Sequence, residues 1–339
     1  MATPTSAAAV VAALSGNAFV TILKFIAFFL SGSGAMLSEA IHSVADTGNQ
    51  LLLYVGLKRA DKEADDRFHY GYGGERFVFG ILSAAGIFFV GCGITLFHGI
   101  SSLVTPHTPH LTATTFGVLG ASFLIEGSVL LYAVRRVRGE KGELPFFTYV
   151  RRHADPATVA ILLEDSAAVL GLLLAAGGIY LSYVTGNPMF DAIGSIVVGL
   201  LLGLVAFYLV RENRELLLGR AVPEGIEDKF KETILDQPSV RSVRDVKTRQ
   251  LTPEAFLFKA EITLDPDFMA EQLGKALPAD PADLHKARTL RRFVSATTDL
   301  IATQVASIEL AVVAAIPQAR HIDLEIAHPE KYSDDEELA

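Results

Sequence analysis

The stretch MLSEAIHSVADTGNQLLLYVGL, residues 36–57, decides the fold because it is long and apolar enough to cross a membrane and yet carries ionisable side chains. Within it Glu39, His42, Asp46 and Asn49 follow one another at i, i+3, i+7 and i+10, a spacing that sets all four in one stripe on the same face of a helix. An ionisable group in the middle of a bilayer costs a few kcal/mol. The stripe therefore indicates a membrane protein with a polar site inside the bilayer.

Composition supports a membrane protein. The chain has 339 residues, of which 50% are hydrophobic and 20% charged, and its mean hydropathy of +0.37 is too high for an ordinary soluble enzyme of this length. Its one cysteine, Cys92, excludes a disulfide framework and a thiolate-rich metal site. Any metal chemistry must therefore use histidine, carboxylate and backbone oxygen.

The first two thirds of the chain predicts an all-α membrane domain, residues 1–220. A transmembrane helix needs about 20 mostly apolar residues. Six segments meet this requirement, with short polar or turn-rich breaks between them. They lie near 7–30, 36–57, 77–101, 114–134, 157–182 and 190–210.

Basic residues predict the orientation of these spans. They occur in the second and fourth connections and after the sixth span, whereas the other three connections contain none. By the positive-inside rule the basic connections face the cytoplasm, so both termini are cytoplasmic. The basic residues are Lys58, Arg59, Lys62, Arg67, Arg76, Arg135, Arg136, Arg138, Lys141, Arg151, Arg152, Arg211, Arg214 and Arg220.

The remainder of the chain predicts a small cytoplasmic α+β domain, residues 221–330, with the element order αββαβ. A dimer is one way for so small a domain to bury its exposed face. Residues 331–339 are expected to form an acidic disordered tail. Residues 1–220 have a net charge of −1 and residues 221–339 of −8, and without a basic patch we expect no nucleic-acid partner.

The polar stripe has a counterpart in the fifth span, where Glu164 and Asp165 are adjacent. Imidazole nitrogen and carboxylate oxygen from two helices, without thiolate, suit Zn²⁺ and tolerate Mn²⁺ or Fe²⁺. Two other readings compete with a metal site: the stripe serves as hydrogen-bonding glue between helices, or a carboxylate is neutralised by a proton or by Lys24. Glu126 in the fourth span is a ligand, a proton carrier or the partner of Lys24.

Enzymatic function is not expected. An intramembrane zinc protease needs His-Glu-x-x-His on one helix, and a serine hydrolase needs an activated serine in a glycine-rich turn; the sequence has neither. A metal sensor or scaffold with a vestigial membrane site remains as an alternative to a transporter.

The stretch from Ser38 to Gln50 resembles the cation diffusion facilitator family of zinc transporters, and in particular its mitochondrial branch, that of the ninth eukaryotic zinc transporter. The resemblance extends over most of the chain. It includes Lys24-Phe25, HYGYG at 69–73, LLEDSAAVLG at 162–171, TGNP at 185–188, LLGR at 217–220, DVK at 245–247 and HIDLE at 321–325.

The resemblance implies a homodimeric, proton-coupled exporter whose ferredoxin-like tail domain holds the dimer together. The family's tetrahedral site maps to His42, Asp46, position 161 and Asp165, but position 161 is isoleucine here. We expect Glu164 to be the fourth ligand, although it lies about 100° round a helix from Asp165; Asn49, Glu39 and water are the alternatives. Accessory zinc sites in the 69–73 loop and the tail domain are expected to be absent or altered.

The sequence thus predicts a transporter that exports a divalent cation from the cytoplasm in exchange for protons, with His42, Asp46, Asp165 and Glu164 as metal ligands. Zn²⁺ is the first choice, as transported substrate rather than cofactor, and Mn²⁺ or Fe²⁺ the alternative. Alternating access around the site explains how the cation crosses the lipid bilayer. Because residues 1–23 contain no arginine, a bacterial cytoplasmic membrane is expected rather than a mitochondrial one.

Overall fold

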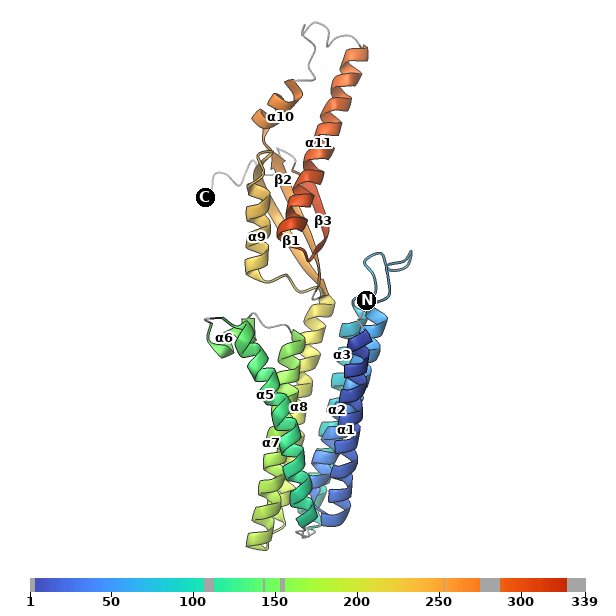
Figure 1. Cartoon of the computed structure of the whole chain (residues 1–339), viewed down its shortest axis with the longest axis vertical. Coiled ribbons are helices and arrows are strands. Elements are labelled where there is room, and N and C mark those ends of the chain that lie inside the picture. Colours follow the sequence, from blue (N-terminus) through green and yellow to red (C-terminus); the bar gives the residue numbers. More distant parts are fainter. Residues whose placement is uncertain are drawn as a thin grey trace. The chain divides into compact units, whose positions relative to one another are not determined.

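A computed structural model describes residues 4–106, 113–142, 144–152, 156–252, 254–274 and 287–327. The chain divides into two compact units, Met1–Leu218 and Gly219–Ala339, each of which is described by itself. The first unit is built from helices and the second contains a small sheet (Figure 1).

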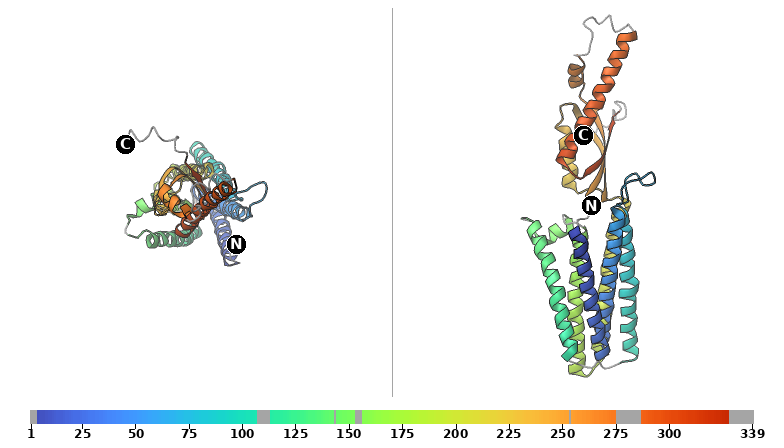
Figure 2. Two further views of the ribbon diagram at one scale, coloured as in Figure 1. Left: turned by 90° about the horizontal axis from the view of Figure 1, so that it is seen from above. Right: turned by 45° about the vertical axis from the view of Figure 1, so that its right-hand side comes forward.

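Long helices that run side by side form the first unit (Figures 1 and 2). Each of the six apolar segments expected from the sequence lies within helical structure. In chain order the elements are α1 (Pro4–Ser31), α2 (Gly34–Ala60), α3 (Glu75–Gly86), the π-helix η1 (Ile87–Ile94), α4 (Thr95–Val104), α5 (Ala113–Glu140), the short α6 (Phe146–Arg152), α7 (Pro156–Thr185) and α8 (Met189–Leu218).

In the described part of the chain, five helical stretches are long and apolar enough to cross a membrane. Four lie in the first unit, at 75–104, 116–139, 162–185 and 189–218, and the fifth is a helix of the second unit. Helix α2, which carries the polar stripe, is not among them, and the described apolar part of α1 is shorter. The protein is a multi-pass membrane protein, while the expected number of six spans stays a prediction.

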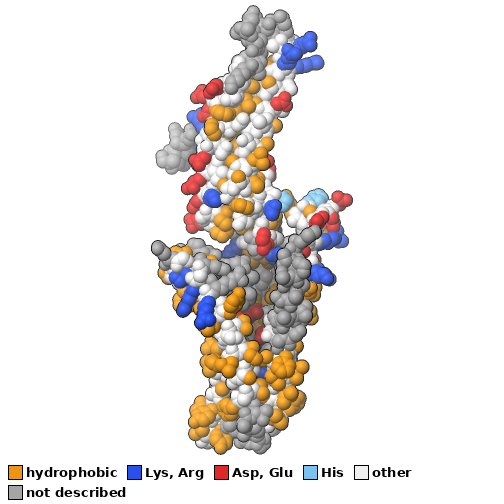
Figure 3. All heavy atoms as spheres, viewed as in Figure 1, with side chains coloured by type: hydrophobic (Ala, Val, Ile, Leu, Met, Phe, Trp, Pro, Cys, Tyr) orange, Lys and Arg blue, Asp and Glu red, His pale blue; other side chains and the backbone are white. Residues whose placement is uncertain are grey.

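The surface of the first unit fits a lipid environment. Bulky apolar side chains such as Phe29, Phe97 and Leu124 are more than 70% exposed. Apolar side chains cover much of the face seen in Figure 3, and Lys and Arg side chains gather at one end of this unit. This distribution is expected of helices that contact lipid along their length and carry most of their basic residues at one membrane surface.

The helices pack closely where glycine allows it. Helix α8 presents Gly199 to Leu96 and Gly203 to Cys92, at distances where an added methyl group would crowd the neighbouring helix. Small residues on α8 therefore let the neighbouring helix approach closely. The π-helical turns of η1, which no feature of the sequence predicted, are the part of the third span that contacts Gly203.

Asp191 fixes the start of α2. Its carboxylate accepts hydrogen bonds from Ser33 Oγ at 2.6 Å and from the Gly34 amide at 2.7 Å, and it is buried. Asp191 lies in the first turn of its own helix α8, where a negative charge is favourable, and it thereby joins the starts of α2 and α8.

The second unit is a three-stranded sheet covered on one face by helices. It contains α9 (Glu224–Leu235), β1 (Val240–Thr252), β2 (Ala255–Leu264), α10 (Pro266–Gly274), α11 (Ala287–Ala315) and β3 (Ala319–Ile326). The central strand β2 pairs antiparallel with β1 and parallel with β3. The elements of this unit follow one another in the order αββααβ. The acidic tail expected at 331–339 lies outside the described residues.

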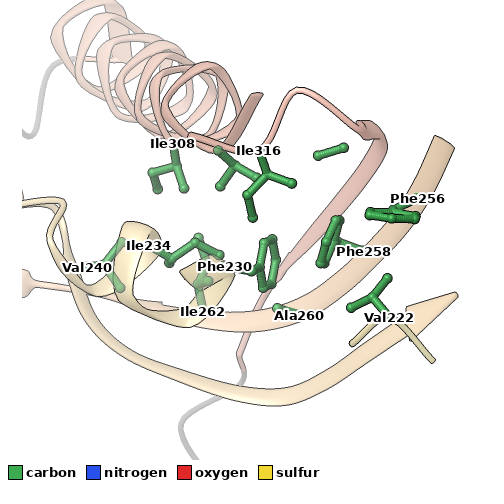
Figure 4. Packing of buried hydrophobic residues seen from close by; sticks show 12 residues of the cluster. Val222, Phe230, Ile234, Val240, Phe256, Phe258, Ala260, Ile262, Ile308 and Ile316 are labelled. Carbon is green, nitrogen blue, oxygen red and sulfur yellow. The ribbon is translucent and has the colours of Figure 1, made fainter. Parts of the chain in front are cut away.

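Alternation along β2 separates a core face from an open face. Phe256, Phe258, Ala260 and Ile262 point into a cluster with residues of α9 and α11 (Figure 4). Phe230 of α9 stacks on Phe258 with ring centroids 4.5 Å apart. Burying these side chains is the main source of stability for this unit.

The opposite face of the sheet carries paired charges. Lys259 of β2 contacts both Asp323 and Glu325 of β3. Asp323 is thus next to a lysine. Among the described residues no group of three His, Cys, Asp or Glu side chains is arranged to hold a metal ion in this unit.

Candidate metal centre

The polar stripe of α2 faces the interior of the first unit. Glu39, His42 and Asn49 are buried and Asp46 is partly exposed, so all four lie on the protected side of the helix. His42 Nε2 lies 3.1 Å from Asp46 Oδ2, one helical turn away. The imidazole and the carboxylate therefore form one unit along α2.

Glu164 of α7 is held against α2 by Asn49. The Asn49 amide nitrogen lies 2.8 Å from each of the two Glu164 carboxylate oxygens. Ser83 Oγ of α3 donates in turn to the Asn49 carbonyl oxygen. This Ser83–Asn49–Glu164 chain joins three helices and fixes the direction of the Glu164 carboxylate.

A cavity of about 360 Å³ opens between α1, α2, α5 and α7. Asp46, Glu126, Glu164 and Asp165 all line it, so carboxylates from three helices share one space. The other lining residues are Asn17, Phe19, Val20, Ser43, Gln50, Ile125, Val129 and Ala168. Glu164 and Asp165 are adjacent in a regular α-helix, yet both reach the cavity wall.

Several buried polar atoms near this cavity have no hydrogen-bond partner among the described residues. They include His42 Nδ1, Asp165 Oδ2, Gln50 Oε1 and Glu126 Oε2. Buried polar groups are normally paired, so a group of such atoms around a cavity calls for an explanation such as a bound ion. Nitrogen and carboxylate oxygen are donors that Zn²⁺ and Mn²⁺ accept.

The side chains do not yet converge on a single point. Within the described part of the chain, no three His, Cys, Asp or Glu side chains are close enough together to hold a metal ion. His42 Nε2 is turned to Asp46, and Glu164 is turned to Asn49. The ligand set of His42, Asp46, Glu164 and Asp165 therefore stays a prediction.

Comparison with known proteins decides the family. Residues 10–218 match the model of the cation efflux transmembrane domain, which is more than half of the chain. The chain belongs to the cation efflux family. The resemblance expected from the sequence, to cation diffusion facilitators, is thereby confirmed.

Individual relatives of this cation efflux protein agree with that assignment. It is 35% identical over 330 residues to the human protein named proton-coupled zinc antiporter SLC30A9, mitochondrial, with 94% of this chain and 58% of the relative aligned. It is 34% identical over 335 residues to metal tolerance protein C4 of Arabidopsis thaliana, covering 95% of this chain and 73% of that one. The chain thus spans little more than half the length of the human relative.

The alternatives for the fourth ligand have other partners in the cation efflux protein. Asn49 donates to Glu164, and Glu39 lies 3.1 Å from the Lys24 ammonium. Glu126, for which ligand, proton carrier and Lys24 partner were all considered, lies 2.7 Å from the same ammonium. The pairing of Glu126 with Lys24 is confirmed, and the other two roles are untested.

The loop between α2 and α3 is ordered by its own side chains. Asp65 accepts hydrogen bonds from Tyr72 Oη, Lys62 Nζ and the backbone amides of Arg67 and Phe68. These donors hold the pKa of the Asp65 carboxyl well below its usual range, with Tyr72 contributing most. Asp65 is therefore engaged in shaping the loop, and no group of three metal-ligating side chains occurs in the described residues there.

Two features of the site escaped the sequence analysis. Ser83 is a lone serine in an apolar span and has no motif around it, so nothing singled it out. Gly171 of α7 lies so close to Glu39 that a methyl group there would overlap the carboxylate. The close approach of Gly171 to Glu39 had one indication in the sequence, which is the presence of a glycine inside a helix.

Proposed function

We propose that this cation efflux protein exports a divalent cation from the cytoplasm in exchange for protons, and that Zn²⁺ is its principal substrate. The observation that supports this most is the cavity lined by Asp46, Glu164 and Asp165, with His42 Nε2 beside it at 3.1 Å from Asp46 Oδ2. Three carboxylates that share one space inside a membrane domain repel one another, and a divalent cation offsets that repulsion.

The proposed ligands are His42, Asp46, Glu164 and Asp165. One imidazole nitrogen and three carboxylate oxygens form a set that Zn²⁺ accepts in tetrahedral geometry. To bind the metal, the His42 imidazole turns away from Asp46. Glu164 keeps a hydrogen bond from the Asn49 amide to one carboxylate oxygen and turns the other oxygen toward the metal. Glu164 replaces the ligand that Ile161 cannot supply.

Exchange for protons follows from the chemistry of the ligands. Imidazole and carboxylate must be deprotonated to coordinate a metal, so metal entry releases protons and proton return expels the metal. Alternating access around one site per chain then couples the two flows. The human relative is named as a proton-coupled zinc antiporter, which supports the same assignment here.

An oxygen-rich shell with a single nitrogen favours a second candidate substrate. Mn²⁺ and Fe²⁺ accept carboxylate oxygen more readily than thiolate, and His42 is the one nitrogen ligand of the proposed set. Export of Mn²⁺ or Fe²⁺ is therefore the alternative within the same mechanism.

We further infer six spans with both ends in the cytoplasm, since the basic connections lie at alternate helix ends. The second unit, with α9 and α11 on one face of a mixed three-stranded sheet, is consistent with a ferredoxin-like domain that joins two copies into a homodimer. The bacterial cytoplasmic membrane stays a prediction, because the human relative is named as mitochondrial.

Metal binding to the purified chain tests the site. We expect wild-type protein in detergent to bind one Zn²⁺ per chain in equilibrium dialysis, and Asp46→Ala and Asp165→Ala to lose that binding while eluting as folded protein. Asp323→Ala, which alters a carboxylate of the second unit beside Lys259, serves as the matched control and should bind as wild type. Zn²⁺ binding that survives in Asp46→Ala would contradict the assignment.

A further inference from the structure

Lys24 of α1 is the largest fully buried side chain of the described residues. Its ammonium lies 3.1 Å from Glu39 Oε2 of α2 and 2.7 Å from Glu126 Oε1 of α5. One cation therefore sits between two carboxylates from two other helices, in the way that a bound metal ion would.

The three charges do not balance. One ammonium faces two carboxylates, and the second oxygen of each carboxylate, Glu39 Oε1 and Glu126 Oε2, is buried without a hydrogen-bond partner in the described part of the chain. Burying charges that are incompletely paired costs folding free energy, so such a cluster indicates a functional role. Each carboxylate therefore has one oxygen on the ammonium and one oxygen to spare.

Lys24, Glu39 and Glu126, the Lys24 cluster, adjoin the proposed transport cavity and lie beyond it along the helices. Glu126 lines the cavity, as does Val20, one turn before Lys24 on α1. Lys24 is about 10 Å along α1 from its end at Ser31, whereas Asn17 of the cavity is about 21 Å from it, at 1.5 Å per residue. The Lys24 cluster therefore lies between the cavity and the end of the unit at which α1 connects to α2.

Glu39 is also packed against α7. The absence of a side chain at Gly171 lets the Glu39 carboxylate approach the helix that carries Glu164 and Asp165. The cluster thus touches all four helices that enclose the cavity: α1, α2, α5 and α7. A change in the ion pairs of Lys24 would therefore alter contacts of all four helices.

We propose that Glu39 and Glu126 form a second divalent-cation position, which the Lys24 ammonium fills in this conformation. Lys24 is then a tethered competitor of the transported cation. It blocks the route from the cavity toward the α1–α2 connection, and it must leave Glu126 before a cation can pass. The identity of the transported cation rests on the proposed function, whereas the existence of the second cation position is independent of it.

Counting bound metal in variants tests this proposal. Asp46→Ala removes the proposed transport site, so any remaining binding reports on the second position. We expect Asp46→Ala to bind no Zn²⁺ or Mn²⁺. The double variant Asp46→Ala/Lys24→Met should bind one equivalent of metal. Adding Glu126→Gln to this double variant should abolish the binding again. Lys58→Met, at the end of α2, is the matched lysine control and should add no metal binding to the Asp46→Ala variant.

The outcomes separate the two proposals. If Asp46→Ala with Lys24→Met binds no metal although it is folded by size-exclusion chromatography, the second position is refuted and the proposed function stands. If Asp46→Ala alone binds as wild type, the proposed transport site fails, and the increment caused by Lys24→Met still reports on the second position.

If Lys24→Met is not recovered as folded protein, Lys24→Arg decides. Arginine keeps the positive charge and can hold a carboxylate through two parallel hydrogen bonds, so it should leave the pair more slowly. We expect an unchanged metal stoichiometry and a transport rate in proteoliposomes at least tenfold lower. A transport rate equal to wild type would refute the blocking role.

Discussion

Replacing Asn49 by leucine should weaken metal binding by one to two orders of magnitude without unfolding the protein. The amide nitrogen of Asn49 lies 2.8 Å from both oxygens of Glu164, and Ser83 holds the other end of the amide. A hydrogen bond to a charged group contributes about 1.5–3 kcal/mol, and 1.4 kcal/mol corresponds to tenfold in affinity. The predicted rise in the Zn²⁺ dissociation constant is therefore about 10- to 100-fold.

The assay is Zn²⁺ titration of purified Asn49→Leu, Ser83→Ala and the double variant. Ser83 acts on Glu164 only through Asn49, so Ser83→Ala should weaken binding less, and the double variant should bind no more weakly than Asn49→Leu alone. Asn213→Leu, which removes an amide that bonds the Leu209 carbonyl in α8, is the control. A dissociation constant of Asn49→Leu within twofold of wild type would refute the idea that Asn49 positions a ligand.

Three further predictions concern stability and the loop. Gly171→Ala should lower the thermal midpoint, because its methyl group overlaps Glu39, whereas Gly177→Ala on the same helix has open space and should not; equal midpoints would contradict the close approach. Asp191→Ala should cost about 1–2 kcal/mol of unfolding free energy, since the Ser33 hydroxyl and the Gly34 amide at the start of α2 lose their acceptor, and denaturation of the purified protein would measure it. The native pKa of Asp65 is lowered, so its support of the loop is full above the unfolded pKa near 4 and is lost as pH falls through the lower native pKa. Tyr72→Phe should shift that loss to higher pH, which amide exchange at Phe68 would detect; an unshifted profile would exclude the Tyr72 hydrogen bond as its cause.

Much of the fold could be predicted because hydropathy and alternation are local signals. The six apolar segments coincide with helical structure, and along β2 buried side chains alternate with less buried ones. The π-helix η1 could not be predicted, because its residues are as apolar as those of a regular transmembrane helix.

The site was predictable as a list of residues but not as an arrangement. The i, i+4 spacing of His42 and Asp46 fixes their contact, since both are on one helix. The Asn49–Glu164 and Lys24–Glu126 contacts depend on how α2, α7, α1 and α5 are rotated against one another, which spacing along one helix does not encode. Lys24 could therefore be named as a charge that neutralises a carboxylate, but its position between two of them required the structure.

Zn²⁺ flux into proteoliposomes under an imposed pH gradient tests the central claim most directly, with Asp46→Ala measured alongside and Mn²⁺ as competitor. The account predicts Zn²⁺ uptake that depends on the gradient and is abolished in Asp46→Ala. Wild-type rates in Asp46→Ala would contradict the site, and the absence of flux for either metal would contradict transport and favour a sensor or scaffold.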